Sequence, residues 1–293
     1  MMYPDGAIYA DLHLHTTASD GAFLPAEMVH RAAQAGMNII SITDHDTVAG
    51  VEEAVLAGEK EGIAVIPGIE LSTGQGEEIH LLGYGIDPDS KALDAFLQAQ
   101  LAGRETRTLA MMERLGQLGM EVEAEEVRSK DTGFMGRMNL ASAMVGRGYA
   151  ASVQAAFDRY LAPGKPAFVP RDRIGTAAGI AALVSFHAMV VLAHPGRMQM
   201  DAQTLATLLP EWMEAGLAGL EAYHASHSEA QRRTYDRMAR TRGLLVTGGS
   251  DSHGRPDGAQ IGDNLRGWRS MHADMQQWIE RITCYPANDI GAK

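Results

Sequence analysis

Cysteine is almost absent from this sequence. Cys284 is the only cysteine among 293 residues, which excludes an internal disulfide and zinc modules built on several thiolates. This scarcity is typical of proteins from a reducing compartment. No apolar run approaches the roughly 20 residues that a membrane helix needs, and the first residues lack the basic and apolar regions of a secretion signal. We therefore expect a soluble, cytoplasmic protein without a membrane partner.

Positive charge is also in short supply. The chain has 37 Asp and Glu against 25 Lys and Arg, a formal net charge of −12. Extended double-stranded nucleic acid binds through many cations that release counterions, so this balance argues against such a partner. A small anionic substrate is not excluded, because the cations are mostly arginine, 20 against 5 lysines, and arginine grips phosphate in a planar fork.

The arrangement of apolar segments indicates the fold class. Apolar, β-branched segments alternate with amphipathic helical ones, which is typical of repeated strand–helix units and a mostly parallel sheet. Between residues 87 and 173 we find no convincing strand, only helical periodicity broken by Gly and Pro. The sequence predicts an α/β barrel formed by 1–88 and 174–293, with an all-helical insertion, 89–173, between strands four and five. The expected strands are 7–12, 38–43, 63–69, 79–84, 189–194, 219–224 and 244–249.

Histidines and carboxylates gather at or just after the ends of the expected strands. A βα barrel carries its catalytic loops at that end. His13 and His15 point to the same side, because residues two apart in an extended chain do so. A lone histidine at a strand end is more often a hydrogen-bonded residue than a ligand, but many ionisable groups are costly to bury together without a metal. We therefore predict one metal site from His13, His15, Asp20, His45, Glu70, His80, His194, Asp251 and His253.

Several motifs resemble those of a known family. DLHLHTTASDG, ITDHDT, GIEL, LAHPG and SDSHG are similar to motifs of the PHP (polymerase and histidinol phosphatase) superfamily of metal-dependent phosphoesterases, in order along essentially the whole chain. The resemblance implies a distorted (β/α)7 barrel of the PHP type with two or three divalent ions. One ion would be held by His13, His15, Glu70 and Asp251. The second would be held by Glu70, His80 and His194, with Glu70 as the bridge, and the third by Asp20, His45 and His253.

The helical insertion resembles the TrpH/YciV-like branch of that superfamily. The branch includes 3',5'-nucleoside bisphosphate phosphatases and a 5'-to-3' exoribonuclease that acts on short RNA. The segments RETR (104–107), FMGRMN (134–139), HPGR (194–197) and EAYHASHS (221–228) carry this closer resemblance. Relatives commonly have GRPH where this chain has Gly136-Arg137-Met138-Asn139.

The ligand types indicate a mechanism. Imidazole and carboxylate suit manganese, which we expect first, and also zinc or iron. A hydroxide bridging two ions at Glu70 would attack phosphorus in line, while the general acid stays open between His194, His224 and a metal-bound water. For Arg104 and Arg107, which share a helix face, solvated surface charges are an equal alternative. The expected substrate contacts are Arg104, Arg107, Arg137, Asn139, Arg197 and His224.

The leading functional hypothesis is a phosphatase that removes the 3'-phosphate of nucleoside 3',5'-bisphosphates, such as adenosine 3',5'-bisphosphate, leaving a nucleoside 5'-phosphate. The first alternative is a 5'-to-3' exoribonuclease on short 5'-phosphorylated RNA. A histidinol phosphatase and a non-catalytic metal-binding PHP module are the others. An amidohydrolase is disfavoured because no lysine falls at a strand end suited to carbamylation. His30, His187 and His272 are expected to have structural or surface roles, and the oligomeric state is left open.

Overall fold

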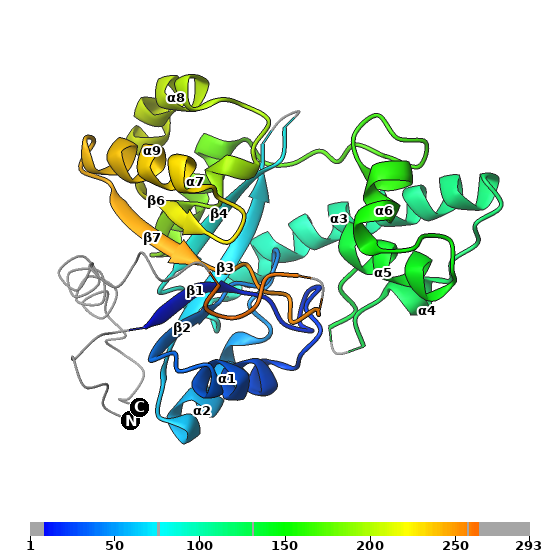
Figure 1. Ribbon diagram of the computed structural model, residues 1–293, viewed down its shortest axis with the longest axis horizontal. Helices are drawn as coiled ribbons and strands as arrows, with labels where there is room; N and C mark the ends of the chain where they lie inside the picture. The colour runs from blue at the N-terminus through cyan, green and yellow to red at the C-terminus, as the bar shows by residue number, and fades with distance from the viewer. Residues whose placement is uncertain (1–8, 75–76, 131, 257, 264–293) are drawn as a thin grey trace.

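A seven-stranded sheet forms the centre of the molecule (Figure 1). The computed structural model describes residues 9–74, 77–130, 132–256 and 258–263. The sheet follows chain order, and its two outer strands approach each other through hydrogen bonds from Asp251 N to His13 O (2.9 Å) and from His15 N to Ser252 O (3.0 Å). The barrel is therefore nearly closed. Its strands are β1 (Ala10–Leu14), β2 (Ile39–Ile42), β3 (Ala64–Thr73), β4 (Ile79–Tyr84), β5 (Met189–Leu192), β6 (Leu217–His224) and β7 (Leu245–Gly249).

The fourth strand runs against its neighbours. β4 is antiparallel to β3 and β5, whereas the other neighbouring strands pair in parallel. β3 and β4 are joined directly, and so short a connection permits only antiparallel pairing. The strand–helix alternation expected from the sequence is interrupted here. The reversal places His80 opposite Ser72, near the end of β3. His80 thus reaches the end of the barrel at which β1, β2 and β3 finish.

Five helices cover the barrel: α1 (Pro25–Gln34), α2 (Val51–Glu61), α7 (Thr176–Ser185), α8 (Ala202–Glu214) and α9 (Glu229–Arg240). A 3-10 turn, η2 (Pro195–Arg197), follows β5. α2 ends at Gly62, whose φ of 71° is left-handed and favours glycine. Strand and helix side chains share one apolar core. In the described part of the chain, no helix is both long enough and apolar enough to cross a bilayer.

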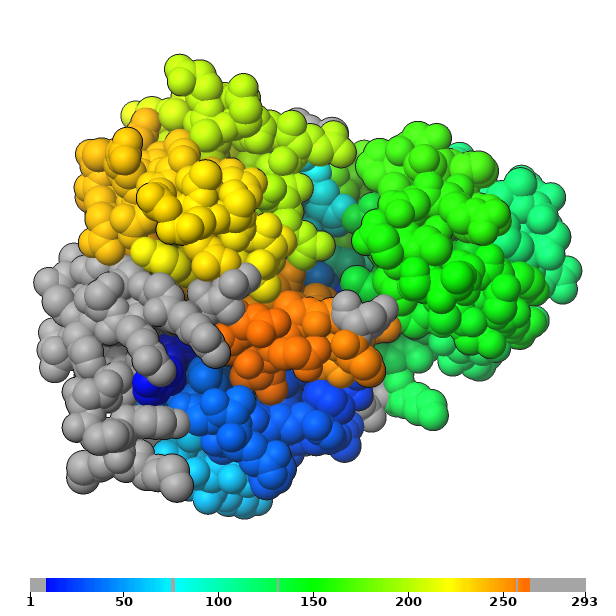
Figure 2. Space-filling view, in the orientation of Figure 1, coloured from blue at the N-terminus to red at the C-terminus, as the bar shows by residue number. Residues whose placement is uncertain are grey.

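The segment between β4 and β5 forms a helical lobe beside the barrel (Figures 1 and 2). It contains α3 (Lys91–Gln117), α4 (Ala124–Val127), α5 (Arg137–Gly146), α6 (Val153–Ala156) and a π-helical turn, η1 (Phe157–Leu161). α3 joins two cores, since Leu93 belongs to the barrel core and Met111 to a separate apolar cluster of the lobe. The domain bounds expected from the sequence, 1–88, 89–173 and 174–293, stay a prediction.

Candidate metal centre

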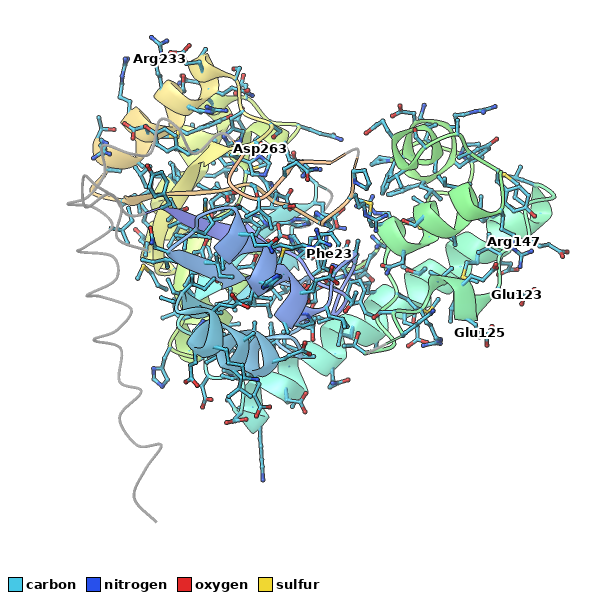
Figure 3. The ribbon with its side chains drawn as sticks, turned by 60° about the horizontal axis from the view of Figure 1, so that its bottom comes forward. Phe23, Glu123, Glu125, Arg147, Arg233 and Asp263 are labelled. Carbon is cyan, nitrogen blue, oxygen red and sulfur yellow. The ribbon has the colours of Figure 1, made fainter. Side chains whose placement is uncertain are left out.

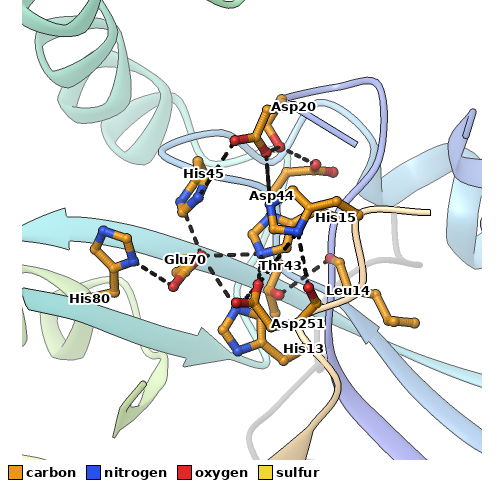
Figure 4. Close-up of polar contacts among 12 residues, drawn as sticks. His13, Leu14, His15, Asp20, Thr43, Asp44, His45, Glu70, His80 and Asp251 are labelled. Carbon is orange, nitrogen blue, oxygen red and sulfur yellow. Dashed lines mark hydrogen bonds and ion pairs between the residues drawn. The ribbon is translucent and has the colours of Figure 1, made fainter. Parts of the chain in front are cut away.

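The nine side chains expected to bind metal converge at one end of the barrel, and Figure 4 labels seven of them, all except His194 and His253. We call them the metal centre. β1 supplies His13 and continues into His15, while Glu70 lies in β3 and His80 in β4. The other ligands lie in loops that follow the strands. The antiparallel course of β4 is what allows an early residue of that strand to join residues at the ends of the others.

Glu70 lies at the centre of this group and is fully buried. One of its oxygens, Oε1, lies 2.8 Å from His80 Nδ1 and 2.9 Å from His194 Nε2. The other oxygen, Oε2, is turned to a different set of rings. It lies 3.0 Å from His45 Nδ1, 3.2 Å from His15 Nε2 and 3.3 Å from His13 Nε2. A carboxylate whose two oxygens face separate groups of histidines has the arrangement that a bridging ligand needs.

Many atoms of the metal centre are buried without a hydrogen-bond partner among the residues that the structure describes. Each such atom costs about 1–3 kcal/mol, so their gathering in one place calls for a partner that the protein does not supply itself. Divalent cations provide one, because imidazole nitrogen and carboxylate oxygen are among their usual ligands. The residues therefore fit metal ions. The atoms concerned are His13 Nε2, His15 Nδ1 and Nε2, His45 Nδ1, Glu70 Oε2, His80 Nε2, His194 Nδ1 and His253 Nε2.

The ligand atoms fall into overlapping groups whose members lie within 4.8 Å of one another. One group equals the set that the family resemblance implies for the first ion, and another contains the set for the third ion together with His15. A further group places His45 with Glu70 and His80, where the resemblance implies His194. The assignment of residues to particular ions stays a prediction. These three groups are His13, His15, Glu70 and Asp251; His15, Asp20, His45 and His253; and His45, Glu70 and His80, and a fourth consists of His13, Glu221 and His224.

The carboxylates and histidines shift one another's pKa values. Burial acts to lower the pKa of His15, but Asp251 and Glu70 outweigh it and raise that pKa to about 10. Burial would raise the pKa of Glu70, yet the surrounding histidines hold it well below its ordinary value. At His194 burial prevails and lowers the pKa to about 3. A neutral His194 suits a metal ligand better than a proton donor.

Strained backbone marks the same end of the barrel. Asp46, His194 and Asp251 have φ values of 53°, 26° and 58°, in the left-handed region that costs a residue with a side chain about 1–3 kcal/mol. The surrounding contacts hold these conformations: His194 N donates to Glu221 Oε2 (2.7 Å), and Asp251 N donates to His13 O (2.9 Å). Such strain persists mainly at functional sites.

Two buried carboxylates, Asp44 and Glu221, support the metal centre, and neither role was predicted from the sequence. Glu221 Oε1 lies 3.0 Å from His13 Nδ1, which leaves His13 Nε2 turned toward the other ligands. Asp44 accepts hydrogen bonds from Thr16 N (2.8 Å) and Ser19 Oγ (2.5 Å), and so fixes the loop before Asp20. The signal that could have found them is the one used for the ligands, because Asp44 follows β2 and Glu221 lies in β6.

A cluster of arginines lies beside the metal centre, and we call it the arginine cluster. Asp46 Oδ2 accepts from Arg104 Nε (3.0 Å) and Nη2 (2.7 Å) and from Arg171 Nη2 (3.1 Å). These arginines outweigh burial and lower the pKa of Asp46 to about 2. The sequence alternative of solvated charges is wrong for Arg104 and Arg107, because both are buried. The members are Arg104, Arg107, Arg137, Arg171 and Arg173.

The second carboxylate of the arginine cluster is Glu78. It forms an ion pair with Arg137, and its Oε2 lies 4.0 Å from Arg173 Nη1. Among the described residues Arg107 has no such partner: its Nε and Nη2 atoms are buried without a hydrogen bond. Burial, followed by the charges of Arg137 and Arg104, lowers the pKa of Arg107 to about 8.

Comparison with known proteins identifies the family. Residues 11–161 match the PHP domain model. This chain belongs to the PHP family. It is 33% identical over 256 residues to a 5'-3' exoribonuclease of Haemophilus influenzae, covering 87% of this chain and 93% of that protein. It is 32% identical over 260 residues to a 3',5'-nucleoside bisphosphate phosphatase of Chromobacterium violaceum, covering 85% and 89%.

A solved structure extends the likeness to the whole PHP chain. A protein from Bifidobacterium adolescentis described as a metal-dependent phosphoesterase matches with a TM-score of 0.82 and 29% identity, over 98% of this chain and 99% of that one. The α/β barrel fold of the PHP type is therefore confirmed. This chain is a metal-dependent hydrolase of phosphate esters, and its histidine and carboxylate cluster could hold the divalent ions.

The other expected substrate contacts of this PHP protein lie in different settings. Asn139 Oδ1 accepts from Gly136 N (3.2 Å), and its Nδ2 donates to Ser19 O (3.3 Å). Its side chain therefore caps α5 and ties it to the loop of Asp20, which does not favour substrate contact. Arg197 is half exposed and donates to Asp251 Oδ2 (2.5 Å), and His224 Nε2 lies 3.4 Å from the same oxygen.

Arg197 and His224 line a cleft of about 520 Å³ between the barrel loops and the helical lobe. The barrel contributes Asp251 and His253 to its wall, and the lobe contributes Gln154. The cleft thus leads to metal-centre residues.

Two histidines outside the metal centre, His30 and His227, have partners of their own. His30 pairs with Glu61 on the surface, as expected. His227 is buried, and its Nδ1 lies 2.9 Å from Ala222 O, which points to a structural role. His272 and Cys284 lie outside the described residues.

Proposed function

We propose that this PHP-family hydrolase removes the 3'-phosphate from nucleoside 3',5'-bisphosphates. The observation that carries the proposal is the adjacency of two sites of complementary chemistry. Asp46 N donates to Glu70 O (2.9 Å), and Glu78 Oε1 lies 3.6 Å from His80 Nε2. The arginine cluster and the metal centre therefore share a border, and a substrate with two phosphates matches one cation-rich site for each of them.

The reaction is a hydrolysis. When bound, divalent ions, for which we propose manganese, neutralise phosphoryl oxygens and lower the pKa of water. A water oxygen forms a bond to phosphorus while the bond between phosphorus and the 3'-oxygen breaks; the 3'-oxygen takes a proton and inorganic phosphate leaves. Glu70 and the histidines around it fix where this can occur. Arg197 and His224, which contact Asp251, lie beside the position of the reacting phosphate.

The cleft beside Arg197 fits a nucleoside better than a run of stacked bases. Its volume of about 520 Å³ is in the range of pockets for small ligands. Its lining, within the described part of the chain, contains no Phe, Tyr or Trp side chain. Proteins that bind single strands usually stack the bases on aromatic rings. This lining supports a mononucleotide as the main substrate.

A second candidate is a 5'-to-3' exoribonuclease that acts on short 5'-phosphorylated RNA. The likeness to the Haemophilus influenzae enzyme supports it. In both reactions a terminal 5'-phosphate occupies the arginine cluster while an ester on the 3' side is cleaved.

Steady-state rates with manganese-loaded protein test the proposal. We expect kcat/KM for adenosine 3',5'-bisphosphate to exceed that for a 5'-phosphorylated trinucleotide RNA. The product should be adenosine 5'-monophosphate, formed in equal amount with inorganic phosphate. A higher kcat/KM on the RNA would favour the exoribonuclease, and inactivity on both substrates would refute both candidates.

A further inference from the structure

The arginine cluster has more positive charge than its own carboxylates balance. Five guanidinium groups face two carboxylates, Asp46 and Glu78. Arg107 shows the deficit most clearly, because it is only 4% exposed and two of its nitrogens have no hydrogen-bond partner in the described part of the chain. A buried charge without a partner is costly. The cluster is therefore incomplete without an added anion.

The two carboxylates of the arginine cluster differ in how firmly they are held. Asp46 is fully buried, receives hydrogen bonds from two arginines, and accepts another from Ser72 N (2.7 Å). Glu78 is partly exposed, with 21% of its side chain accessible; it pairs closely with Arg137 and lies farther from His80 (3.6 Å) and Arg173 (4.0 Å). Asp46 is thus a fixed part of the structure. Glu78 can be replaced by another anion at much lower cost.

The anion that best fits is a terminal phosphate. A phosphate monoester carries a charge of about −1.5 to −2 and three acceptor oxygens, whereas Glu78 offers one charge and two oxygens. A phosphodiester has only one charge and resembles Glu78 in this respect. The border with the metal centre at His80 places such a phosphate on the same molecule as the ester to be cleaved.

On the basis of the proposed function, we propose that Glu78 is a resident counter-ion that the 5'-phosphate of the substrate displaces. This phosphate then binds Arg107 together with Arg137 and Arg173. The lowered pKa of Arg107 agrees with this, because its cause is burial among like charges, which an added dianion relieves. Glu78 then sets the preference for a terminal phosphate, since only an anion of higher charge replaces it with a net gain.

Two substrates that share the metal centre provide the test. Adenosine 3',5'-bisphosphate and adenosine 3'-monophosphate have the same scissile ester, and only the first has a 5'-phosphate. The ratio of their kcat/KM values therefore measures the 5'-phosphate alone, and any effect of a variant on metal binding at His80 cancels. For Arg107→Gln we expect the ratio to fall by about ten-fold or more, the loss of one charge-assisted contact. Arg107→Lys should recover part of it, and Glu78→Gln should raise the ratio several-fold.

Matched control variants come from the outer side of the helical lobe. Arg147 and Glu126 form an exposed ion pair there, and Figure 3 shows Arg147 far from the barrel. Arg147→Gln and Glu126→Gln make the same charge changes as the test variants and should leave the ratio unchanged. Binding of adenosine 5'-monophosphate, compared with adenosine, by calorimetry on the metal-loaded protein gives a second measurement that needs no turnover.

The outcomes separate the two proposals. An unchanged ratio in Arg107→Gln, with both substrates hydrolysed, overturns the phosphate site and leaves the proposed function standing. A lower ratio of the two kcat/KM values in Glu78→Gln than in the wild type overturns the proposed displacement of Glu78 by the 5'-phosphate. If the wild type hydrolyses neither substrate, the proposed function fails. The calorimetry then decides the phosphate site: it requires weaker binding of adenosine 5'-monophosphate in Arg107→Gln and tighter binding in Glu78→Gln, and equal binding refutes it.

Discussion

The metal centre and the arginine cluster lie side by side and are both buried, yet they lack opposite things. In the metal centre, histidine nitrogens and a Glu70 oxygen converge without hydrogen bonds and need cations. In the arginine cluster, Arg107 and its neighbours exceed the carboxylates and need an anion. Each site alone is an incomplete structure. Together they suit a doubly phosphorylated molecule: metal ions fill the metal centre and bind one phosphate, and the other phosphate supplies the anion that the arginine cluster needs.

The two sites also differ in how the chain builds them. The ligands of the metal centre come from the strand ends of one barrel. In the arginine cluster, Arg104 lies in the helical lobe and Arg171 in the segment before α7, while Asp46 comes from the loop after β2. The ligands of the metal centre therefore all come from the barrel. The arginine cluster depends on how the lobe is held against the barrel, and Asp46 is one of the contacts that holds it.

The largest expected effect is at the carboxylate that bridges the metal centre. Glu70→Gln keeps the shape of the side chain but removes its charge. We expect kcat/KM to fall by roughly ten-thousand-fold, because bound ions contribute several kcal/mol to the transition state. Metal content, measured by elemental analysis, should fall with it. His30→Ala, on the surface, serves as the control, and a Glu70→Gln protein with full metal content and near-normal turnover would show that the bridge is not needed.

The next effect concerns the arginine cluster. Asp46→Asn leaves Arg104 and Arg171 buried without a counter-charge, and we expect the free energy of unfolding to fall by about 3–5 kcal/mol, as for other buried ion pairs that lose one partner. Urea titration followed by circular dichroism measures this. Glu126→Gln, which breaks an exposed pair of the lobe, should show no comparable loss. Equal stability of the two variants would mean that Asp46 does not hold the lobe to the barrel.

Sequence reasoning works well for the metal centre because the rule it uses is local. His13 and His15 adjoin a strand, and a barrel brings its strand ends together whatever the loops do. The antiparallel direction of β4 could not be predicted, since the pattern of residues 79–84 indicates a strand but not its direction. His80 still reached the metal centre because the strand begins, rather than ends, at that side of the barrel.

The arginine cluster was harder to predict. Arg104 and Arg107 could be selected as phosphate contacts from RETR, but their burial could not be read from helical periodicity. Asp46 pairs with Arg104, which is 58 positions away in the chain, and with Arg171, which is 125 positions away. Nothing in the sequence pattern specifies how the lobe packs against the barrel. Glu221 was overlooked although it follows the same rule as the ligands, because only a structure shows that it contacts His13 rather than a metal.

A smaller effect is expected at Glu221, which acts on the metal centre through His13. Glu221→Gln keeps a side chain that can still contact His13 Nδ1 and His194 N but removes the charge that favours their positions. We expect metal affinity to fall by about 10–100-fold, as for other groups that orient metal-binding histidines. Metal titration by calorimetry measures it, and activity should return when excess manganese is added. A loss of activity that excess metal does not restore would indicate a direct catalytic role instead.

The smallest effect separates two roles for Asn139. The side chain of Asn139 forms hydrogen bonds with Gly136 N at the start of α5 and with Ser19 O. Asn139→Ala should therefore lower the free energy of unfolding by about 1 kcal/mol, the usual value of a helix cap. The KM for adenosine 3',5'-bisphosphate should stay unchanged, because both contacts of the amide are with backbone groups of the protein itself. Thermal unfolding and steady-state kinetics on the same preparation check both values. A raised KM without a change in stability would place Asn139 with the arginines as a substrate contact, and the helical lobe would then bind substrate through more than its charges.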